Sequence, residues 1–417
     1  MAREREDARN PKDQLTKRAM LVWAGGMLVY IVAITGRTSL GVAGVDALAH
    51  FQINNSQLAV FSSVQLGVYA LTQIPIGIAI DKFGARRVLV AGAIIMGLGQ
   101  ILLGLTNSYP IAILARVLVG GGDATAFLSV MRILPTWFPL RLTPLFTQLT
   151  SALGQSGQFL SAVPFLALLG AQGWQVAFIS LGAVGILIAL AAAILVSDSP
   201  VQRPTPTTDT TKLVDVLRNP VCWMGFFNHG LMLMPLIVFT LLWGMPLMTL
   251  GMGLSPQLAA HILVLNTVAN VLIGPFHGIL SARFGARREL LTIGFAMVIA
   301  ASFLWLFASA SPRGWWAIAV VSILLGALGP SANYGFDSVR EKLPYHVVTT
   351  GTGLANMGGF TAAMLASQGV GILLDHHAEG TPSWHDFAFA WGAVAAVWTV
   401  AILGLVAARY AVRRKAI

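Results

Sequence analysis

The chain has 417 residues, of which 56% are hydrophobic and only 10% are charged, and its mean hydropathy is +0.76. A soluble globular domain does not need so apolar a composition to fill its core, so that class is excluded and an integral membrane protein is indicated. The formal net charge of +10 is compatible with binding to nucleic acid, but its distribution along the chain argues against that partner.

Twelve apolar runs follow one another along the chain, each long enough to cross a hydrocarbon core as a helix of about 20 residues. We predict them at 20–45, 57–80, 88–106, 110–132, 143–170, 174–196, 221–247, 257–280, 288–308, 315–338, 349–374 and 386–410. The first run is too long for a cleavable signal, so we expect it to be retained. The predicted class is therefore all-α, with 12 transmembrane helices.

Lys and Arg residues gather at alternate ends of these runs. If the N-terminus is cytoplasmic, nearly all of the 26 lie in cytoplasmic tails, in loops on that side or at adjoining helix ends. Arg313 lies on the opposite side. This asymmetry predicts two cytoplasmic tails, 1–19 and 411–417, and with the short loops it favours a multi-pass protein of a bacterial inner membrane whose partners are the lipid bilayer and a small molecule.

The first run carries an arginine, Arg37, within "YIVAITGRTSLGVAGVDALAHF". An ionisable group in a membrane helix is unfavourable unless it is paired or hydrated, which makes it a functional candidate. A guanidinium can hold a carboxylate or a phosphate by two parallel hydrogen bonds. Three interpretations stay open, namely a ligand for a substrate anion, an ion pair with Asp123 or Asp46, and a hydrated position at the membrane edge.

The loop after the second run reads "GIAIDKFGARRVL", residues 77–89. Gly84 permits a tight turn, and Asp81 can cap a helix or pair with neighbouring arginines. Arg86 and Arg87 suit the anionic headgroups at a membrane surface. The loop is thus a candidate conformational latch, with a simple positive anchor as the alternative.

The fourth run, "ARVLVGGGDATAFLSVMRILP", contains Arg116 and Asp123. Seven residues make two helical turns, so the two side chains share a face of the helix. The three glycines at 120–122 permit close helix approach. Asp123 is the best candidate for a site that gains and loses a proton as a cavity opens and closes, and a static ion pair is the alternative.

Neutral polar side chains also recur on single helix faces, and in lipid such faces must turn inward. We expect Tyr69, Gln73 and Gln155 to line a wet cavity, although hydrogen bonds between helices explain them equally well. His229, beside Asn228 in the seventh run, is either a neutral substrate donor or proton relay, or a packed histidine with satisfied hydrogen bonds. The histidines of the second half are not spaced as a metal site, so no metal is expected.

Near the end of the tenth run, "NYGFDSVREKLP" places Asp337, Arg340 and Glu341 at helical spacing. Because they lie near the predicted cytoplasmic end, we expect a gate or a capping salt bridge from Asp337 and Arg340.

The segment 197–220, "SDSPVQRPTPTTDTTKLVDVLRNP", is rich in Pro and Thr and reads as a linker. Beyond it, "GILSARFGARREL" at 278–290 nearly repeats the 77–89 loop, with Ala282 where the first copy has Asp81. A repeat joined by one linker predicts two six-helix bundles, 20–196 and 221–410, related by duplication. Without the acid, the second loop is expected to be the weaker latch.

Asp81-Lys82, Gly84 and Arg86-Arg87 resemble the signature loop of the major facilitator superfamily. Helix number, linker and repeat agree with that resemblance over essentially the whole chain. It implies two bundles that alternate access to a central cavity, and a loop that latches one side. Arg116 followed by Gly120 resembles the fourth-helix arginine motif of the superfamily, which implies a part in proton coupling.

Arg37 followed by "SLGVA" resembles the anion:cation symporters and organophosphate transporters of this superfamily. That resemblance implies that Arg37 helps to hold a substrate anion. The chain departs from it at Gly36, where an aspartate is common, and in the seventh run, which has no arginine.

The leading hypothesis is a proton-coupled symporter that takes up a small organic anion, with Arg37 on the anion and Asp123 carrying the proton. It would work as a monomer and use the proton gradient rather than a cofactor. An enzyme is disfavoured, because the chain has no nucleotide-binding glycine loop, nucleophile elbow or His-Glu metal spacing.

The alternative is a proton-driven exporter of drugs, lipids or metabolites. The fifth-helix glycine-proline motif of such exporters is degraded here, since Ser161, Ala162 and Val163 precede Pro164.

Overall fold

The computed structural model describes residues 15–53, 55–199, 213–378 and 380–414. Over these residues the chain is almost entirely helical and forms no strand. The predicted all-α class is therefore confirmed. Most of the predicted N-terminal tail, the central part of the linker (200–212) and the last three residues lie outside the described chain.

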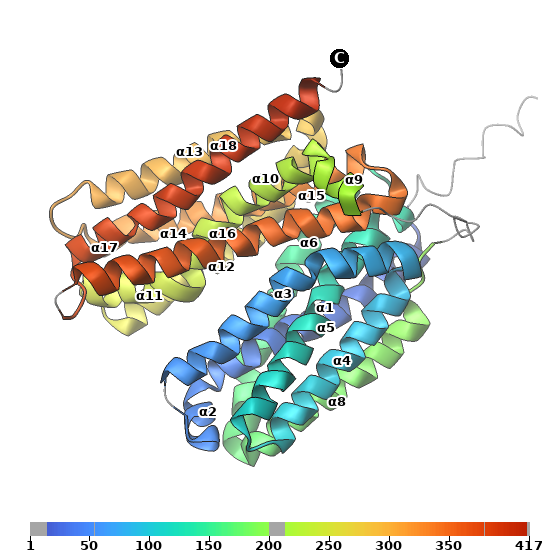
Figure 1. The fold of residues 1–417 in the computed structure, drawn as a ribbon, viewed down its shortest axis with the longest axis horizontal. Coiled ribbons are helices and arrows are strands. Elements are labelled where there is room, and N and C mark those ends of the chain that lie inside the picture. The colour runs from blue at the N-terminus through green and yellow to red at the C-terminus, as the bar shows by residue number, and fades with distance from the viewer. Residues whose placement is uncertain (1–14, 54, 200–212, 379, 415–417) are drawn as a thin grey trace, which may run out of the picture. The chain divides into compact units, whose positions relative to one another are not determined.

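The described chain falls into two compact units (Figure 1). The first unit takes in the described residues before 213 together with Pro344–Gly353, and the second takes in Leu213–Leu343 and the described residues from Leu354. The bundle limits expected from the sequence, 20–196 and 221–410, did not assign Pro344–Gly353 to the first group, and they stay a prediction.

The helices of the first unit are α1 (Lys17–Val42), α2 (Gly44–Phe51), α3 (Asn55–Phe83), α4 (Ala85–Leu105), α5 (Tyr109–Trp137), α6 (Thr143–Gly154), α7 (Ser156–Leu160) and α8 (Leu166–Leu195). A π-helical turn at Ser161–Phe165, which contains Pro164, joins α7 to α8. The backbone of α8 is broken at Gly173, where φ is 79°.

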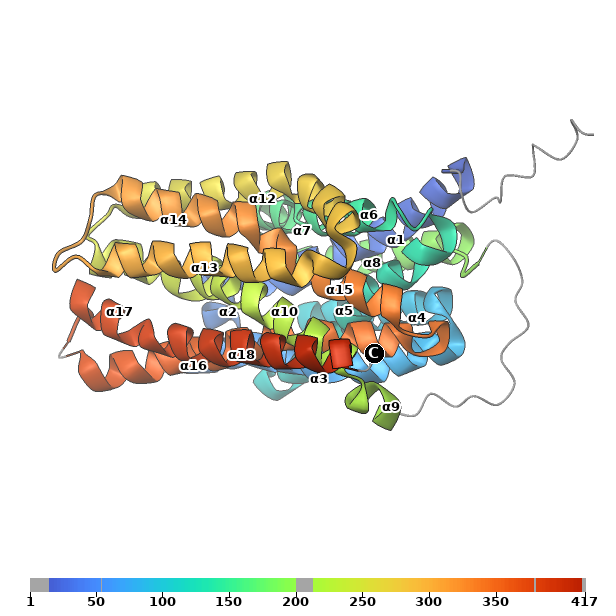
Figure 2. The ribbon, with the colours of Figure 1, turned by 90° about the horizontal axis from the view of Figure 1, so that it is seen from above.

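The helices that begin in the second unit are α9 (Leu213–Arg218), α10 (Pro220–Ile237), α11 (Gly244–Pro246), α12 (Pro256–Phe284), α13 (Arg288–Phe307), α14 (Trp315–Leu328), α15 (Tyr334–Lys342), α17 (Trp384–Ala390) and α18 (Gly392–Arg414). Helix α16 (Val348–His377) begins within the 344–353 segment and continues into the second unit. The residues of α16 before 354 belong to the first unit. Figure 2 shows the axes of α12, α13, α14 and α18 lying nearly parallel to one another, with the chain reversing direction between α12 and α13.

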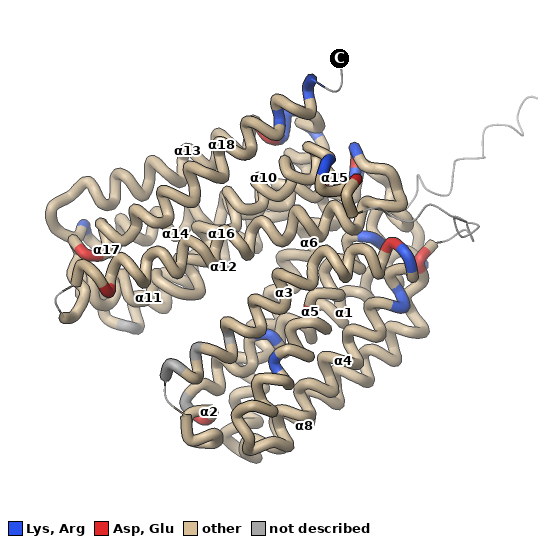
Figure 3. Tube along the Cα trace, viewed as in Figure 1, with Lys and Arg blue, Asp and Glu red and all other residues tan. Residues whose placement is uncertain are grey.

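Ten helical stretches of the described chain are long and apolar enough to cross a membrane. Eight of them have 21 to 33 residues, whereas Thr143–Leu195 and Gln257–Phe307 have 53 and 51. Each of these two long stretches contains a glycine with positive φ, Gly173 in one and Gly285 in the other. Charged residues gather near helix ends, and most of the helix length carries none (Figure 3).

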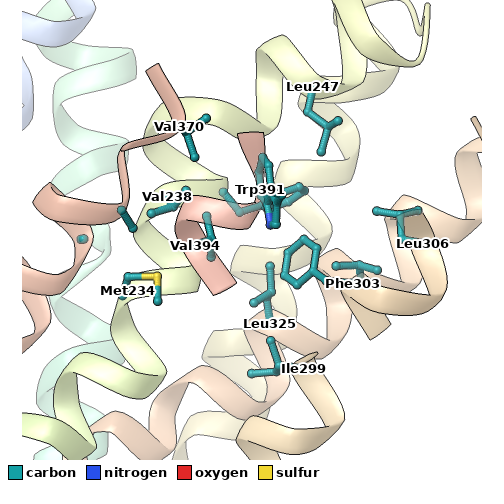
Figure 4. Close-up of a cluster of buried hydrophobic side chains, with 14 of the residues drawn as sticks. Met234, Val238, Leu247, Ile299, Phe303, Leu306, Leu325, Val370, Trp391 and Val394 are labelled. Carbon is teal, nitrogen blue, oxygen red and sulfur yellow. The ribbon is translucent and has the colours of Figure 1, made fainter. Parts of the chain in front are cut away.

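Apolar side chains fill the interior of the second unit (Figure 4). Met234 from α10, Phe303 from α13 and Leu325 from α14 are buried together with Trp391, which lies between α17 and α18. The rings of Phe303 and Trp391 lie 5.5 Å apart between centroids. Such contacts hold helices together by van der Waals packing, which replaces the hydrophobic effect within a bilayer.

Candidate functional site

An ion pair inside the first unit joins α1 to α5. Arg37 donates from Nε to Oδ2 of Asp123 at 2.7 Å and from Nη2 to Oδ1 at 2.9 Å. The side chain of Asp123 is fully buried and that of Arg37 is 20% exposed. This is the two-bond fork by which a guanidinium holds a carboxylate. Of the two acids considered for Arg37, the structure pairs it with Asp123, whereas Asp46 lies in the first turn of α2.

Glycines bring α5, which carries Asp123, close to two of its neighbouring helices. A Cβ atom at Gly120 would lie 2.7 Å from the main-chain oxygen of Gln65 on α3, and one at Gly122 would lie 2.4 Å from that of Gly92 on α4. Neither position has room for a side chain, so α5 packs directly against α3 and α4. The close approach expected from the glycine run is confirmed.

Arg116 is buried on the same helix as Asp123 but binds the backbone of α1. Its Nη2 donates to the carbonyl oxygen of Arg37 at 3.2 Å and its Nη1 to that of Gly36 at 3.5 Å. Its Nε has no hydrogen-bond partner in the described chain. Arg116 therefore supports the segment that carries Arg37, while its own positive charge is balanced only by carbonyl dipoles and by the field of Asp123.

The cluster has an excess of positive charge. Arg37 and Arg116 contribute two guanidinium groups, and Asp123 is the single acidic residue between Asp81 and Asp198 in the sequence. With Asp123 ionised, the three groups carry a net charge of about +1 in a region of low dielectric constant. An arrangement of this kind attracts an anion.

Gln100 completes the support of α1, and sequence reasoning missed it. Its Nε2 donates to the carbonyl oxygen of Gly36 at 2.9 Å, and the side chain is buried on α4. A signal was present, because Gln100 is the one polar side chain between Arg87 and Thr106. An isolated amide in an apolar membrane helix has to find a partner on another helix.

Tyr69 meets the ion pair from α3. Its ring lies beneath the guanidinium of Arg37, with Cζ 4.6 Å from the ring centroid. Tyr30 of α1 also interacts electrostatically with Arg37 and Asp123. Gln73, one turn beyond Tyr69, donates to the carbonyl oxygen of Tyr69 at 3.1 Å and is buried. Tyr69 thus belongs to the site, and Gln73 bonds to the backbone of its own helix.

Two other predicted residues lie apart from the ion pair. Gln155, at the junction of α6 and α7, accepts a hydrogen bond from Gln158 at 2.6 Å. His229 lies in the second unit, buried on α10, with its Nδ1 3.2 Å from the carbonyl oxygen of Ala332 and its ring packed on Phe336. The structure does not bring either residue into contact with Arg37, and their substrate-binding roles stay predictions.

The 77–89 loop binds the start of α16 within the first unit. Asp81 accepts hydrogen bonds from the main-chain nitrogens of Thr349 and Thr350 at 3.2 and 2.8 Å, and from the Thr350 hydroxyl at 2.7 Å. Arg132 lies 3.4 Å from the same carboxylate. A carboxylate at a helix N-terminus satisfies unpaired N–H groups and complements the helix dipole. The capping role expected of Asp81 is therefore present, but its arginine partner is Arg132 of α5 and not an arginine of its own loop.

The chain turns at Gly84, between Asp81 and the two arginines of this loop. Gly84 has a φ of 88°, a conformation that glycine adopts without strain. Arg86 donates from its main chain to Asp198 at 2.8 Å and from its guanidinium to the carbonyl oxygen of Ala193. Arg87 is exposed. The contact of Arg86 and Arg87 with lipid headgroups stays a prediction.

In the second copy of the loop, an acid from another helix reaches the turn that contains Ala282. Asp337 on α15 forms the expected ion pair with Arg340 at 2.7 Å, and it also accepts a hydrogen bond from the Ser281 hydroxyl. Sequence reasoning missed two further buried residues, Arg288 and Glu289. Arg288 pairs with Glu341 at 2.8 Å.

Glu289, on the same turn of α13, accepts from the Ser338 hydroxyl at 2.8 Å and lies 3.8 Å from Lys342. Three acids and three bases therefore join α15 to α12 and α13 with no net charge. Ala282 contributes no acid to this network, but Asp337 reaches the same turn through Ser281.

The architecture and the buried charges define a polytopic helical membrane protein with an anion-attracting cluster. Residues 26–367 match the model of the Major Facilitator Superfamily, and the chain belongs to this family. A probable sulfoacetate transporter from Cupriavidus necator is 31% identical over 173 residues, which are 42% of this chain and 40% of that protein. A probable galactarate/D-glucarate transporter from Escherichia coli is 26% identical over 201 residues, 45% of this chain and 44% of that one.

The matched segments cover less than half the length of these curated relatives. Among solved structures, the fucose:proton symporter of E. coli aligns with 93% of this chain and 99% of its own, with a TM-score of 0.69 and 15% identity. At that identity the likeness shows the fold alone.

Proposed function

We propose that this protein is a secondary active transporter that works by alternating access and takes up a small organic anion together with a proton. The observation that carries the proposal is the buried cluster of two arginines and one aspartate in the first unit, with Arg37 partly exposed. The names of the relatives, which include carriers of sulfoacetate and of sugar diacids, support an anionic substrate.

The geometry of the pair suggests how anion and proton are coupled. A substrate carboxylate that approaches the exposed part of Arg37 takes over the two-bond fork that now holds Asp123. Asp123 then has no guanidinium partner in a buried position, where an unpaired charge is strongly unfavourable. It takes up a proton from the medium and becomes neutral. When the anion leaves on the other side, Arg37 is free to pair again and Asp123 releases the proton.

The neighbours of Arg37 remain in place during this exchange. Arg116 and Gln100 hold the backbone carbonyls next to Arg37, and the ring of Tyr69 faces its guanidinium. A preorganised arginine loses less conformational freedom when it binds an anion. These residues are therefore positioning residues for Arg37.

The topology that we propose has twelve crossings. A helix of 53 residues would be about 80 Å long at about 1.5 Å per residue, far longer than a hydrocarbon core of about 30 Å. Thr143–Leu195 and Gln257–Phe307 therefore each cross twice, turning near Gly173 and Gly285, which raises ten stretches to twelve crossings. Both tails would be cytoplasmic, in the inner membrane of a bacterium.

Uptake into proteoliposomes tests the proposal. The purified protein is given an inward proton gradient and radiolabelled sulfoacetate or D-glucarate, and Arg37→Gln and Asp123→Asn are compared with the wild type. Loss of a buried charge partner of the anion is worth about 2–5 kcal/mol, so Arg37→Gln is expected to weaken uptake by about 30-fold or more. Asp123→Asn is expected to retain anion exchange without a response to the gradient.

Arg313→Gln is the matched control, because Arg313 lies outside the apolar helices, where its guanidinium donates to the main-chain oxygen of Trp305 and lies over the Trp305 ring. It is expected to transport as the wild type does. The proposal fails if neither anion is taken up. It gives way to export if lipophilic cations or neutral drugs exchange for protons and Arg37→Gln leaves that exchange intact.

A further inference from the structure

The anion-attracting cluster contains one carboxyl group. Between residues 14 and 198 the sequence has three acids, Asp46, Asp81 and Asp123. Asp46 begins α2, and Asp81 lies near the end of α3, where it caps the start of α16. Within the described part of the chain, Arg37 forms an ion pair with Asp123 alone, so Asp123 is the acid whose basic partner a substrate anion would take.

The other groups that face Asp123 do not add an acid. Arg37 and Tyr30 come from α1, and Tyr69 meets Arg37 from α3. Arg116 lies on α5 itself, and α4 contributes the neutral amide of Gln100. The charges on these groups are two positive and one negative when Asp123 is ionised.

Gly36 and Gln100 occupy the place where a second acid could stand. Gly36 precedes Arg37 directly, and a Cβ atom there would lie 2.8 Å from Nε2 of Gln100. The amide of Gln100 thus fills the space next to Gly36 and donates to its carbonyl oxygen. A larger side chain at residue 36 needs Gln100 to move, and in the wild type the polar group at this position is neutral.

One proton and one anion carboxylate leave the charge of the cluster unchanged. The empty cluster with ionised Asp123 carries a net charge of about +1, and the loaded cluster carries two guanidinium groups, one substrate carboxylate and a neutral Asp123, again about +1. A second proton has no acceptor in this cluster.

The buried acids of the second unit are differently placed. Asp337 and Glu289 have basic partners in Arg340 and Lys342 on their own unit. An anion that binds to Arg37 does not remove those partners, so its binding gives neither acid a reason to take up a proton.

We infer that Gly36 and Gln100 restrict the site to a single titratable carboxyl, Asp123, so that the protein couples one proton to each substrate anion. The inference rests on the proposed function. It assigns the proton stoichiometry and the two residues that set it.

The stoichiometry is measured as the accumulation of substrate at zero net flux. Proteoliposomes with the full-length protein are held at zero membrane potential with valinomycin and equal potassium concentrations, and a pH difference is imposed. Labelled sulfoacetate or D-glucarate, both fully ionised near neutral pH, serves as the probe. One proton per anion gives about 10-fold accumulation per pH unit, and two protons give about 100-fold, whatever the valence of the anion.

A designed acid tests the role of Gly36 and Gln100. The double variant Gly36→Asp with Gln100→Ala places a carboxyl beside Arg37 and removes the amide that would collide with it. Its accumulation is expected to rise above 10-fold per pH unit, toward 100-fold. The matched control, Gly36→Asn with Gln100→Ala, has the same shape without the acid and is expected to keep the wild-type slope.

The wild-type slope decides the inference even if the double variants do not fold. A wild-type slope of about 100-fold per pH unit would overturn the one-proton inference and leave anion symport standing. Equal slopes in the active Asp and Asn variants would overturn the role assigned to residue 36. If the wild type accumulates neither probe, the proposed function fails, and the stoichiometry that rests on it fails as well.

Discussion

Arg37 and Asp123 occupy buried positions that either charge alone would make unfavourable. Two hydrogen bonds from the guanidinium of Arg37 to the carboxylate of Asp123 compensate for the hydration that both side chains lose in these positions. Such a pair contributes little net stability, but removal of one partner leaves an uncompensated charge. Because an unpaired charge is unfavourable here, the pair is sensitive both to mutation of one partner and to an anion that competes for Arg37.

The difference between removing one charge of the pair and removing both predicts the stability of single and double variants. Asp123→Ala is expected to destabilise the protein by about 3 kcal/mol, because Arg37 loses its partner in a mostly buried site. Arg37→Met combined with Asp123→Leu removes both charges and should recover most of that loss. Thermal unfolding of the purified proteins in detergent checks this, and a double variant no more stable than Asp123→Ala would contradict it.

Residue spacing predicted only part of this site. The seven-residue spacing of Arg116 and Asp123 places them on one side of α5, as two helical turns require. It left open which arginine binds Asp123. That depended on α1, where Arg37 stands 86 positions away in the sequence. Gln100 was missed for the same reason, since its partner is a main-chain carbonyl on another helix.

At the scale of elements, the glycines of α5 decide how closely the helices pack. Gly120 and Gly122 face the backbones of α3 and α4, whereas Gly121 points to a space where the nearest atom, from Val68, would lie 3.9 Å from an added Cβ. The three adjacent glycines therefore have different environments, although the sequence presents them as one run. A helix period of 3.6 residues turns neighbours in the chain to different faces.

Alanine substitutions separate these environments. Gly122→Ala is expected to destabilise the protein by about 1–3 kcal/mol, because its methyl group would overlap the Gly92 carbonyl oxygen and force α4 from α5. Gly121→Ala is the matched control and should change stability little. Unfolding midpoints in detergent test the pair, and equal midpoints would show that the packing relaxes without cost.

The two similar loops at 77–89 and 278–290 differ in the source of the acid that binds them. In the first copy, the acid is on the loop and binds α16, so the loop contacts an element distant in sequence. In the second copy, Asp337 on α15 supplies the acid, and the network stays among α12, α13 and α15. Because Ala282 stands where the first copy has Asp81, the sequence predicted a weaker latch in the second copy. The structure shows a dense ionic network there, whose strength as a latch stays untested.

At the scale of the whole molecule, the apolar stretches and the charge asymmetry predict a topology. The loop between α13 and α14 is expected to lie outside the cell and the end of α18 inside it. In a Cys222→Ser background, Ser311→Cys should react with a membrane-impermeant maleimide on intact cells. Arg414→Cys should react only after the cells are opened. Labelling of both sites on intact cells would contradict cytoplasmic termini.

The sequence by itself determined the class of this protein and much of its organisation. Apolar runs separated by polar loops predict membrane helices, because a bilayer leaves few other ways to satisfy backbone hydrogen bonds. The repeated loop identified the superfamily, which the family match confirms. Buried ionisable residues in apolar runs also marked Arg37, Arg116 and Asp123 as candidates, since lipid tolerates few charges without a partner.

Only the tertiary structure decided which partners these residues have. It paired Arg37 with Asp123, turned Arg116 and Gln100 to the backbone of α1, and grouped Pro344–Gly353 with the first unit. These contacts join residues far apart in the chain, and their existence depends on which helix faces meet. A periodic pattern shows that one face of a helix is polar. Which residues of other helices that face contacts depends on where small residues allow the helices to pack.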